Sequence, residues 1–216
     1  MMAAAGLQPA LRLPGSRFWA PYRSTMDPER FKQLGLTAIR WADKAHRLYI
    51  AADVFARPAA QAMSRALFER GAGDAERLEA IQHCRAYGDA SNLLYGLAIE
   101  NAYKTRQILD GKVSIENGKF KDMRSDHNIL EMARAHGIIF SQQELDVMKC
   151  ITFATVTMGK YPIALSAEKQ KSFTGRTYGA DYVAPLTKRI VLELLKESPY
   201  TDIFLKGRHS GIDDTG

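Results

Sequence analysis

Apolar residues recur at steps of three and four positions through most of this 216-residue chain. Because this spacing gathers apolar side chains on one side of a helix, it predicts amphipathic α-helices. A hydrophobic content of 46% is enough to fill the core that such helices enclose. The pattern therefore predicts an all-α fold, a bundle of about six or seven helices. The clearest single stripe consists of Phe31, Leu34, Ala38, Trp41, Ala45, Leu48, Ala52 and Phe55.

Capping residues, prolines and glycines mark helix boundaries in the first half of the chain. Asp27-Pro28-Glu29 is typical of a helix start, and Pro58 predicts the end of this first long helix and the start of a second. Gly71-Ala72-Gly73 predicts a turn, after which Asp74 caps a third helical segment. We expect that segment to kink or break at Gly88.

Two features are predicted in the middle of the chain. A helix resumes over 90–109, and Gly96 in its interior indicates a close crossing with another helix, because glycine otherwise lowers helix propensity. In 112–125, apolar and polar residues alternate around Asn117-Gly118, which is a strong signal for a tight turn. This segment therefore predicts a short hairpin or loop insertion.

Three more helices are predicted in the C-terminal part. The first is capped by Ser125 or Asp126. The second follows the capping box Ser141-Gln142-Gln143-Glu144, and the third runs over about 181–197. Residues 160–179 are expected to form a loop between these last two helices.

The predicted helices divide the chain into three parts. These are a flexible N-terminal arm over 1–25, a single helical-bundle domain over 26–197 and a C-terminal tail over 198–216. The arm is basic and has no acidic residue before Asp27, and organelle transit peptides have the same composition. Translation could alternatively start at Met26.

Cysteine content and hydropathy indicate the compartment. Cys84 and Cys150 are too few for a disulfide scaffold or a zinc knuckle, which favours free thiols in a reducing environment. No run in the sequence approaches the roughly 18 apolar residues of a membrane span. We therefore expect a cytoplasmic protein that has no membrane partner.

The formal net charge of +6 favours a polyanionic partner such as RNA. Two predicted loops concentrate the positive charge and also carry Phe173 and Tyr178, which are available to stack on bases. The alternative is that these basic side chains only keep the loops solvated. The candidate nucleic-acid contacts are Lys112, Lys119, Lys121, Arg124, Lys160, Tyr161, Lys169, Lys171 and Arg176.

Three stretches of the sequence resemble one family of helical bundles. They are LAIENAYKTRQILDG over 97–111, HNILEMARAHGIIFSQQEL over 127–145 and GKYP over 159–162. Their order is similar to that of the HEPN superfamily, in which a lysine-bearing helix ends in glycine and a histidine opens the next helix. The resemblance covers roughly residues 91–162. It implies a helical bundle whose relatives include toxin ribonucleases and defence-associated proteins.

Active members of that family carry an arginine followed after about four to six residues by a histidine, which meet at a dimer interface and cleave RNA without a metal. The matching stretch over 152–166 contains Lys160 with no histidine after it. The same spacing occurs at Arg40 and His46 and at Arg77 and His83, where a solvated helix face explains it. We therefore predict no catalytic residue, and the departure from the family pattern argues against enzyme activity.

Polar residues interrupt the apolar side of the helix over 90–109. Glu100, Asn101 and Lys104 lie near its centre and form a candidate polar pocket. His127 is expected to face them across the bundle, because buried polar groups need partners and these side chains would supply one another. The alternative is a partly exposed Glu–Lys pair at i,i+4 and a surface histidine.

The sequence predicts no metal and no cofactor. Asp126, His127 and Glu131 offer only one histidine beside two carboxylates, which is a poor ligand set. The glycines of the chain also lack the spacing of a phosphate-binding loop.

Together these observations predict a HEPN-like helical protein that binds RNA or a protein partner, in a defence or toxin–antitoxin setting, with a homodimer among the expected states. One alternative is a divergent metal-independent ribonuclease, and another is a structural or regulatory bundle with no nucleic-acid role. An exposed polar pocket at His127 would favour an enzyme, and a contiguous basic face would favour nucleic acid. A large exposed apolar stripe would favour a protein partner.

Overall fold

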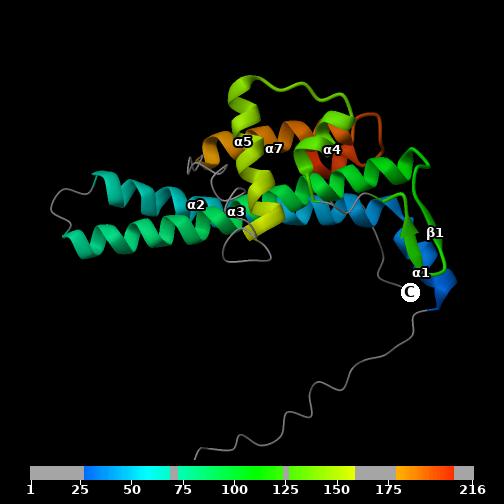
Figure 1. Ribbon diagram of the computed structural model, residues 1–216, viewed down its shortest axis with the longest axis horizontal. Coiled ribbons are helices and arrows are strands. Elements are labelled where there is room, and N and C mark those ends of the chain that lie inside the picture. The colour runs from blue at the N-terminus through cyan, green and yellow to red at the C-terminus, as the bar shows by residue number, and fades with distance from the viewer. Residues whose placement is uncertain (1–26, 69–72, 124–126, 159–178, 207–216) are drawn as a thin grey trace, which may run out of the picture.

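The computed structural model describes residues 27–68, 73–123, 127–158 and 179–206. Within these ranges the chain forms seven α-helices, one π-helical turn and one small sheet, so the predicted all-α bundle is confirmed. Two long helices, α2 (Ala38–Phe68) and α3 (Asp74–Leu109), lie side by side along the longest axis of the molecule (Figure 1). The shorter helices cover only one part of this pair.

The chain enters α2 through a short helix, α1 (Pro28–Gly35). Asp27 caps α1 as predicted, because its side chain accepts hydrogen bonds from the backbone N–H groups of Glu29 and Arg30. The prediction of one unbroken helix from this start is wrong, since α1 ends at Gly35 and α2 begins at Ala38. The indole N–H of Trp41 donates to the carbonyl oxygen of Gly35 at 2.9 Å, which satisfies a carbonyl at the end of α1.

Pro58 lies inside α2 and does not end it, which corrects the predicted boundary. A proline in a helix removes one backbone hydrogen bond and crowds the carbonyl group four residues earlier. That group belongs to Val54, which is 62% exposed. Water can therefore solvate the unbonded carbonyl, and α2 continues to Phe68.

The long helix α3 also runs without a break, so the expected interruption at Gly88 is wrong. A single interior glycine costs only about 1 kcal/mol of helix propensity, which is small beside the packing of α3 along the whole of α2. The N-cap residue is Gly73 rather than Asp74, and the backbone N–H of Gly73 donates to the carboxylate of Glu76 at 3.0 Å.

The predicted close crossing at Gly96 is confirmed. It joins α3 to α5 (Gln142–Phe153) and to the π-helical turn η1 (Ala154–Met158) that follows α5. A Cβ atom on Gly96 would lie 1.9 Å from the hydroxyl oxygen of Thr155 and 3.2 Å from the Cγ2 atom of Ile151. The side chains of Thr155 and Ile151 therefore occupy the space that a Cβ atom at position 96 would need.

The predicted hairpin is also confirmed. Strands β1 (Ser114–Glu116) and β2 (Lys119–Lys121) pair antiparallel with Ile115 opposite Phe120. Asn117 and Gly118 connect them with φ angles of 51° and 69°, as a type I′ turn requires. Phe120 lies against the ring of Trp41, with ring centroids 5.9 Å apart, so the hairpin packs on the start of α2.

Helix α4 (Ile129–Ala135) begins later than predicted, and Asn128 caps it in place of Ser125 or Asp126. His127 has a φ angle of 57°, which is left-handed, so a right-handed helix cannot include it. The predicted capping box of α5 is confirmed, since Ser141 and Glu144 exchange two hydrogen bonds of 2.8 and 3.3 Å.

The last predicted helix is α7 (Ala180–Leu194), which ends before residue 197, and a further short helix, α8 (Thr201–Lys206), follows it. Phe204 in α8 is only 6% exposed and belongs to the core. Helix α8 is therefore part of the folded bundle, and the predicted start of the C-terminal tail at residue 198 is too early. The core lies between α2, α3, α4, α5, α7 and α8, and its fully buried side chains include Tyr95, Ile99, Ile129, Met132, Met148, Ile151, Ile190 and Leu194.

Candidate functional sites

The buried carboxylate of Glu100 is the centre of a polar cluster in the bundle. Glu100 is 2% exposed and lies in the middle of α3. One carboxylate oxygen is 2.5 Å from the ammonium nitrogen of Lys104, one helical turn later. The other is 2.8 Å from Nδ1 of His127, in the loop before α4. The structure thus brings together three of the four residues of the predicted polar pocket.

The fourth residue, Asn101, forms its hydrogen bond outside this cluster. Its side-chain amide donates to the carbonyl oxygen of Leu97 in its own helix at 2.6 Å. Trp41 takes its place, because the ammonium nitrogen of Lys104 lies 5.3 Å from the centre of the indole ring. Sequence reasoning assigned Trp41 only to the core stripe, and its spacing alone gave no sign of this cation–π contact.

His127 is more exposed to solvent than Glu100 and Lys104. Its side chain is 29% exposed, and that of Glu100 is 3% exposed. A carboxylate acceptor at Nδ1 favours the tautomer that carries its proton there, which leaves Nε2 as the acceptor in the neutral ring. The arrangement can therefore hold a proton-accepting nitrogen in a fixed position. It also ties the loop before α4 to the middle of α3.

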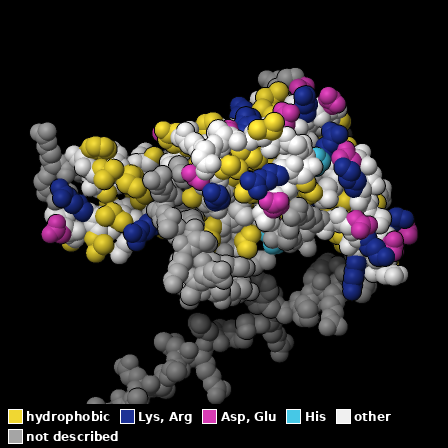
Figure 2. Space-filling view, turned by 45° about the horizontal axis from the view of Figure 1, so that its top comes forward, with side chains coloured by type: hydrophobic (Ala, Val, Ile, Leu, Met, Phe, Trp, Pro, Cys, Tyr) yellow, Lys and Arg dark blue, Asp and Glu magenta, His cyan; other side chains and the backbone are white. Residues whose placement is uncertain are grey.

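The predicted basic face is only partly described. Lys112 is 3.0 Å from a carboxylate oxygen of Asp110, and Lys121 is 2.6 Å from one of Glu116. Figure 2 shows basic and acidic side chains interspersed around the end of the molecule that holds the hairpin. Within the described ranges, Lys119 is the candidate contact without an ion pair. Arg124, Lys160, Tyr161, Lys169, Lys171 and Arg176, with Phe173 and Tyr178, lie outside the described residues.

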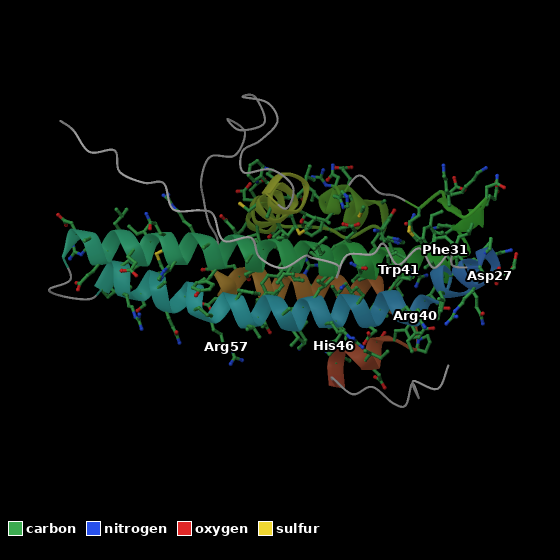
Figure 3. All side chains as sticks on the ribbon, turned by 90° about the horizontal axis from the view of Figure 1, so that it is seen from below. Asp27, Phe31, Arg40, Trp41, His46 and Arg57 are labelled. Carbon is green, nitrogen blue, oxygen red and sulfur yellow. The ribbon has the colours of Figure 1, made fainter. Side chains whose placement is uncertain are left out.

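The two arginine–histidine spacings do not form pairs. His46 is 9% exposed and lies edge-on to the ring of Phe204 in α8, while Arg40 is exposed on the same helix (Figure 3). Arg77 and His83 are both exposed near the start of α3. A solvated or packed helix face accounts for each of these residues.

The exposed apolar ends of α2 and α3 are a second feature, which the sequence did not predict. Residues 54–68 of α2 and 74–90 of α3, which we call the projection, extend beyond the helices that cover the rest of the pair (Figure 1). Only Ala56, Ala62 and Cys84 are buried among its described residues. The large apolar side chains that it exposes are Val54, Phe55, Met63, Leu67, Phe68, Leu78, Ile81 and Tyr87. Their helical spacing is visible in the sequence, but their exposure is not, because it depends on where the shorter helices lie.

A groove of about 450 Å³ is lined by residues of α2 from Ala56 to Phe68 and by the start of α7. Burial raises the pKa of the Cys84 thiol in this groove, and the nearby carboxylate of Asp89 raises it further. The thiol is therefore held in its protonated form, which is a poor nucleophile. The groove lining consists of Ala56, Ala59, Ala60, Met63, Ser64, Leu67, Phe68, Cys84, Gly88, Ser91, Asn92, Gly179 and Asp181.

Two kinds of feature are absent from the described residues. No three histidine, cysteine, aspartate or glutamate side chains among them are grouped so that they could hold a metal ion. No helix in the same ranges is both long enough and apolar enough to cross a lipid bilayer.

Comparisons with known proteins add no relative to these observations. No protein-family model, no curated protein and no solved structure matches the chain. The resemblance to the HEPN superfamily therefore stays a prediction.

Proposed function

We propose that the protein acts by binding another protein through the apolar surface of its two-helix projection. One observation carries this proposal. The projection exposes large apolar side chains on both helices, including Leu67 at 64%, Phe68 at 76% and Leu78 at 57%. Large exposed apolar side chains gathered on one part of a molecule are typical of a site where a second protein binds.

The charge distribution supports a protein partner over RNA. Two of the three described candidate RNA contacts, Lys112 and Lys121, already have carboxylate partners. A nucleic-acid site instead needs cations that are free to neutralise phosphates. On this proposal the protein is a HEPN-like bundle that works by association and needs no catalytic pair of its own, in a defence or toxin–antitoxin setting.

The proposal is tested with Leu67→Glu and Leu78→Glu, which place a charge on the exposed surface. Tagged wild-type protein and each variant are used to capture proteins from the native cells, and captured proteins are quantified by mass spectrometry. We expect a set of proteins that wild type retains and both variants lose. Gln33→Glu, an exposed change on α1 with the same added charge, is the control and should retain that set. Identical capture by all four proteins would contradict the proposal.

A second function is favoured by one specific observation. Glu100 fixes Nδ1 of His127 and so presents Nε2 for proton transfer, as a divergent metal-independent ribonuclease would need. Purified protein and His127→Ala are compared in an RNA cleavage assay with chelator present. Cleavage that disappears in the variant would support this activity, and equal background rates would exclude His127 as its acid or base.

A further inference from the structure

The groove that α2, α3 and α7 line has the size of a small-molecule site. Its volume of about 450 Å³ falls within the range of about 300–1,000 Å³ that is usual for such sites. Its α2 wall runs from Ala56 to Phe68, about 18 Å at the rise of an α-helix, and Ser64 is the polar residue in it. On α3, Gly88 has no side chain to fill the space. The groove can therefore hold an elongated apolar molecule.

Two polar side chains of α3 also line this groove. Ser91 is 4% exposed and Asn92 is 9% exposed. Ser91 has a partner, because it forms a hydrogen bond with the phenol group of Tyr95, which in turn donates to the carboxylate of Asp53. The side-chain amide of Asn92 forms no hydrogen bond with any residue in the described ranges. A buried hydrogen-bonding group is therefore available inside the groove.

Asn92 is unfavourable for the stability of α3. Burying an amide without a hydrogen bond costs free energy, and asparagine is also a poor helix former. Asn101, which is equally buried in the same helix, satisfies its amide by donating to the carbonyl oxygen of Leu97 at 2.6 Å. Because buried polar groups in proteins nearly always have partners, the missing partner of Asn92 points to a bound molecule.

The charge and chemistry of the lining select the polar group of that molecule. Asp181 at the start of α7 is exposed and negative, and no lysine or arginine is among the described residues that line the groove. An anionic ligand would therefore lose hydration without gaining a cation. The amide of Asn92 offers two N–H donors and a carbonyl acceptor. An uncharged group that both accepts and donates, such as another amide, matches it.

We propose that this groove binds a small molecule with an elongated apolar chain and an uncharged amide head. The carbonyl oxygen of the head accepts a hydrogen bond from Nδ2 of Asn92, and its N–H group donates to Oδ1. The chain lies along α2 and covers Ala56, Ala60 and Met63. This site goes beyond the protein partner proposed above, because the purified protein alone binds the ligand.

Octanamide and octanoate test the head group, because they share one chain and differ in charge. Each is titrated into isotope-labelled full-length protein while the NMR signals of the amide groups are followed. We expect octanamide to shift the signals of groove residues, including the side-chain amide of Asn92, and octanoate to bind about 10-fold more weakly or worse. No binding of octanamide up to its solubility limit, equal binding of the two compounds, or shifts only outside the groove would overturn the inference.

Asn92→Leu tests the polar contact with a side chain of similar size. The dissociation constant for octanamide should rise about 10-fold, and the preference over octanoate should disappear. The variant should be at least as stable to heat as the wild type, because it removes an unsatisfied buried amide. Gln33→Leu, the same kind of change at an exposed position of α1, should leave binding unchanged. An unchanged preference for octanamide, or a clear loss of stability, in Asn92→Leu would contradict the role given to Asn92.

Ala60→Phe tests the position of the apolar chain. Ala60 is exposed and lines the groove, so a phenyl ring there fills the groove without disturbing the core. Octanamide binding should be lost while the circular dichroism spectrum keeps its helical shape. Ala75→Phe, at an exposed alanine of α3 outside the groove lining, is the matched control and should bind as the wild type does. Full binding by Ala60→Phe would place the ligand elsewhere and overturn the inference.

Discussion

The two halves of the α2–α3 pair have similar helical structure and opposite surroundings. In the half next to the hairpin, residues 38–53 and 91–109 are covered by further helices, and Tyr95 and Ile99 are completely buried. In the projection, the largest buried side chain belongs to Cys84. Two helices alone bury only the narrow strip where they touch, so the difference shows that the third layer creates the core.

Charges follow the same division. Around the covered half, ion pairs such as Arg106 with Asp110 and Arg189 with Glu144 join described residues at 2.8 and 2.7 Å. In the projection, Arg65 and Glu79 have no such pairing in the described part of the chain. Ion pairs among the described residues thus gather around the covered half, while the projection has both apolar area and charges available for another molecule.

The largest expected difference between the halves comes from truncating apolar side chains. Ile99→Ala should lower the free energy of unfolding by about 4 kcal/mol, because it leaves a cavity in a closed core. Leu78→Ala, at a side chain that is 57% exposed, should cost less than about 1 kcal/mol in the monomer. Urea unfolding of both variants measures the two values. Equal losses would show that the projection is packed as tightly as the core.

Adding one methyl group sharpens the comparison. Gly96→Ala places a carbon 1.9 Å from the hydroxyl oxygen of Thr155 and should cost about 3 kcal/mol. Gly73→Ala, at the start of α3, meets no atom within 4 Å and should cost under about 1 kcal/mol. Thermal unfolding tests both. Thr155→Ala should recover part of the loss when it is combined with Gly96→Ala, and a purely additive double variant would disprove the steric explanation.

Removing a serine hydroxyl group should lower the stability of the protein in the covered half but not in the projection. Ser141→Ala removes the side-chain acceptor that caps α5 and should cost about 1 kcal/mol. Ser64→Ala in the projection replaces an exposed serine by a better helix former, so its effect should be near zero or slightly stabilising. The midpoints of denaturant unfolding compare the stabilities of the two variants, provided that their m-values are equal. A larger loss at Ser64 would reveal a contact made by this hydroxyl group.

The smallest expected effect is a pH dependence in the covered half. Burial lowers the pKa of His136 below its usual value of 6.5, despite the opposing influence of Asp110. The unfolded chain then binds the proton more readily, so stability is present above pH 6.5 and falls as the pH decreases through this value. His136→Asn should flatten the plot of unfolding free energy against pH between pH 7 and 5. Parallel plots for the two proteins would contradict this assignment.

The parts of the fold that the sequence predicted depend on local chemistry. The turn at Asn117-Gly118, the capping box at Ser141 and the cap at Asp27 each involve residues within a few positions of one another. The close crossing at Gly96 could also be predicted, because a glycine lowers the stability of a helix interior and is favoured there when a neighbouring element needs the space. Such local signals depend little on contacts with distant parts of the chain.

The features that were missed depend on distant contacts. Pro58 was expected to end a helix, and only the exposure around Val54 explains why it does not. The short helix α8 was missed because Phe204 gains its stability from packing against His46 and Tyr49, far away in the sequence. The exposure of the projection depends on where the shorter helices stop, which no local pattern encodes.

The candidate functional sites also contain features that could be predicted from the sequence and features that could not. The approach of Lys104 to Glu100 follows from their spacing of one helical turn and could be predicted. The approach of His127 to Glu100 was predicted from the need of buried polar groups for partners, but the left-handed conformation of His127 was not. The exposure of the apolar residues in the projection is known only from the structure, in which no described helix covers them.

Pro58 and Gly88 also determine the mechanics of the molecule. The rings of Phe55 and Tyr87 lie 6.4 Å apart, which places the proline of α2 and the glycine of α3 at nearly the same level of the pair. One helix lacks a backbone hydrogen bond there, and the other lacks a side chain that restricts its backbone. The backbone of both helices is therefore less constrained at the base of the projection. Any bend at this level would move the tip of the projection further than any other part of the two helices.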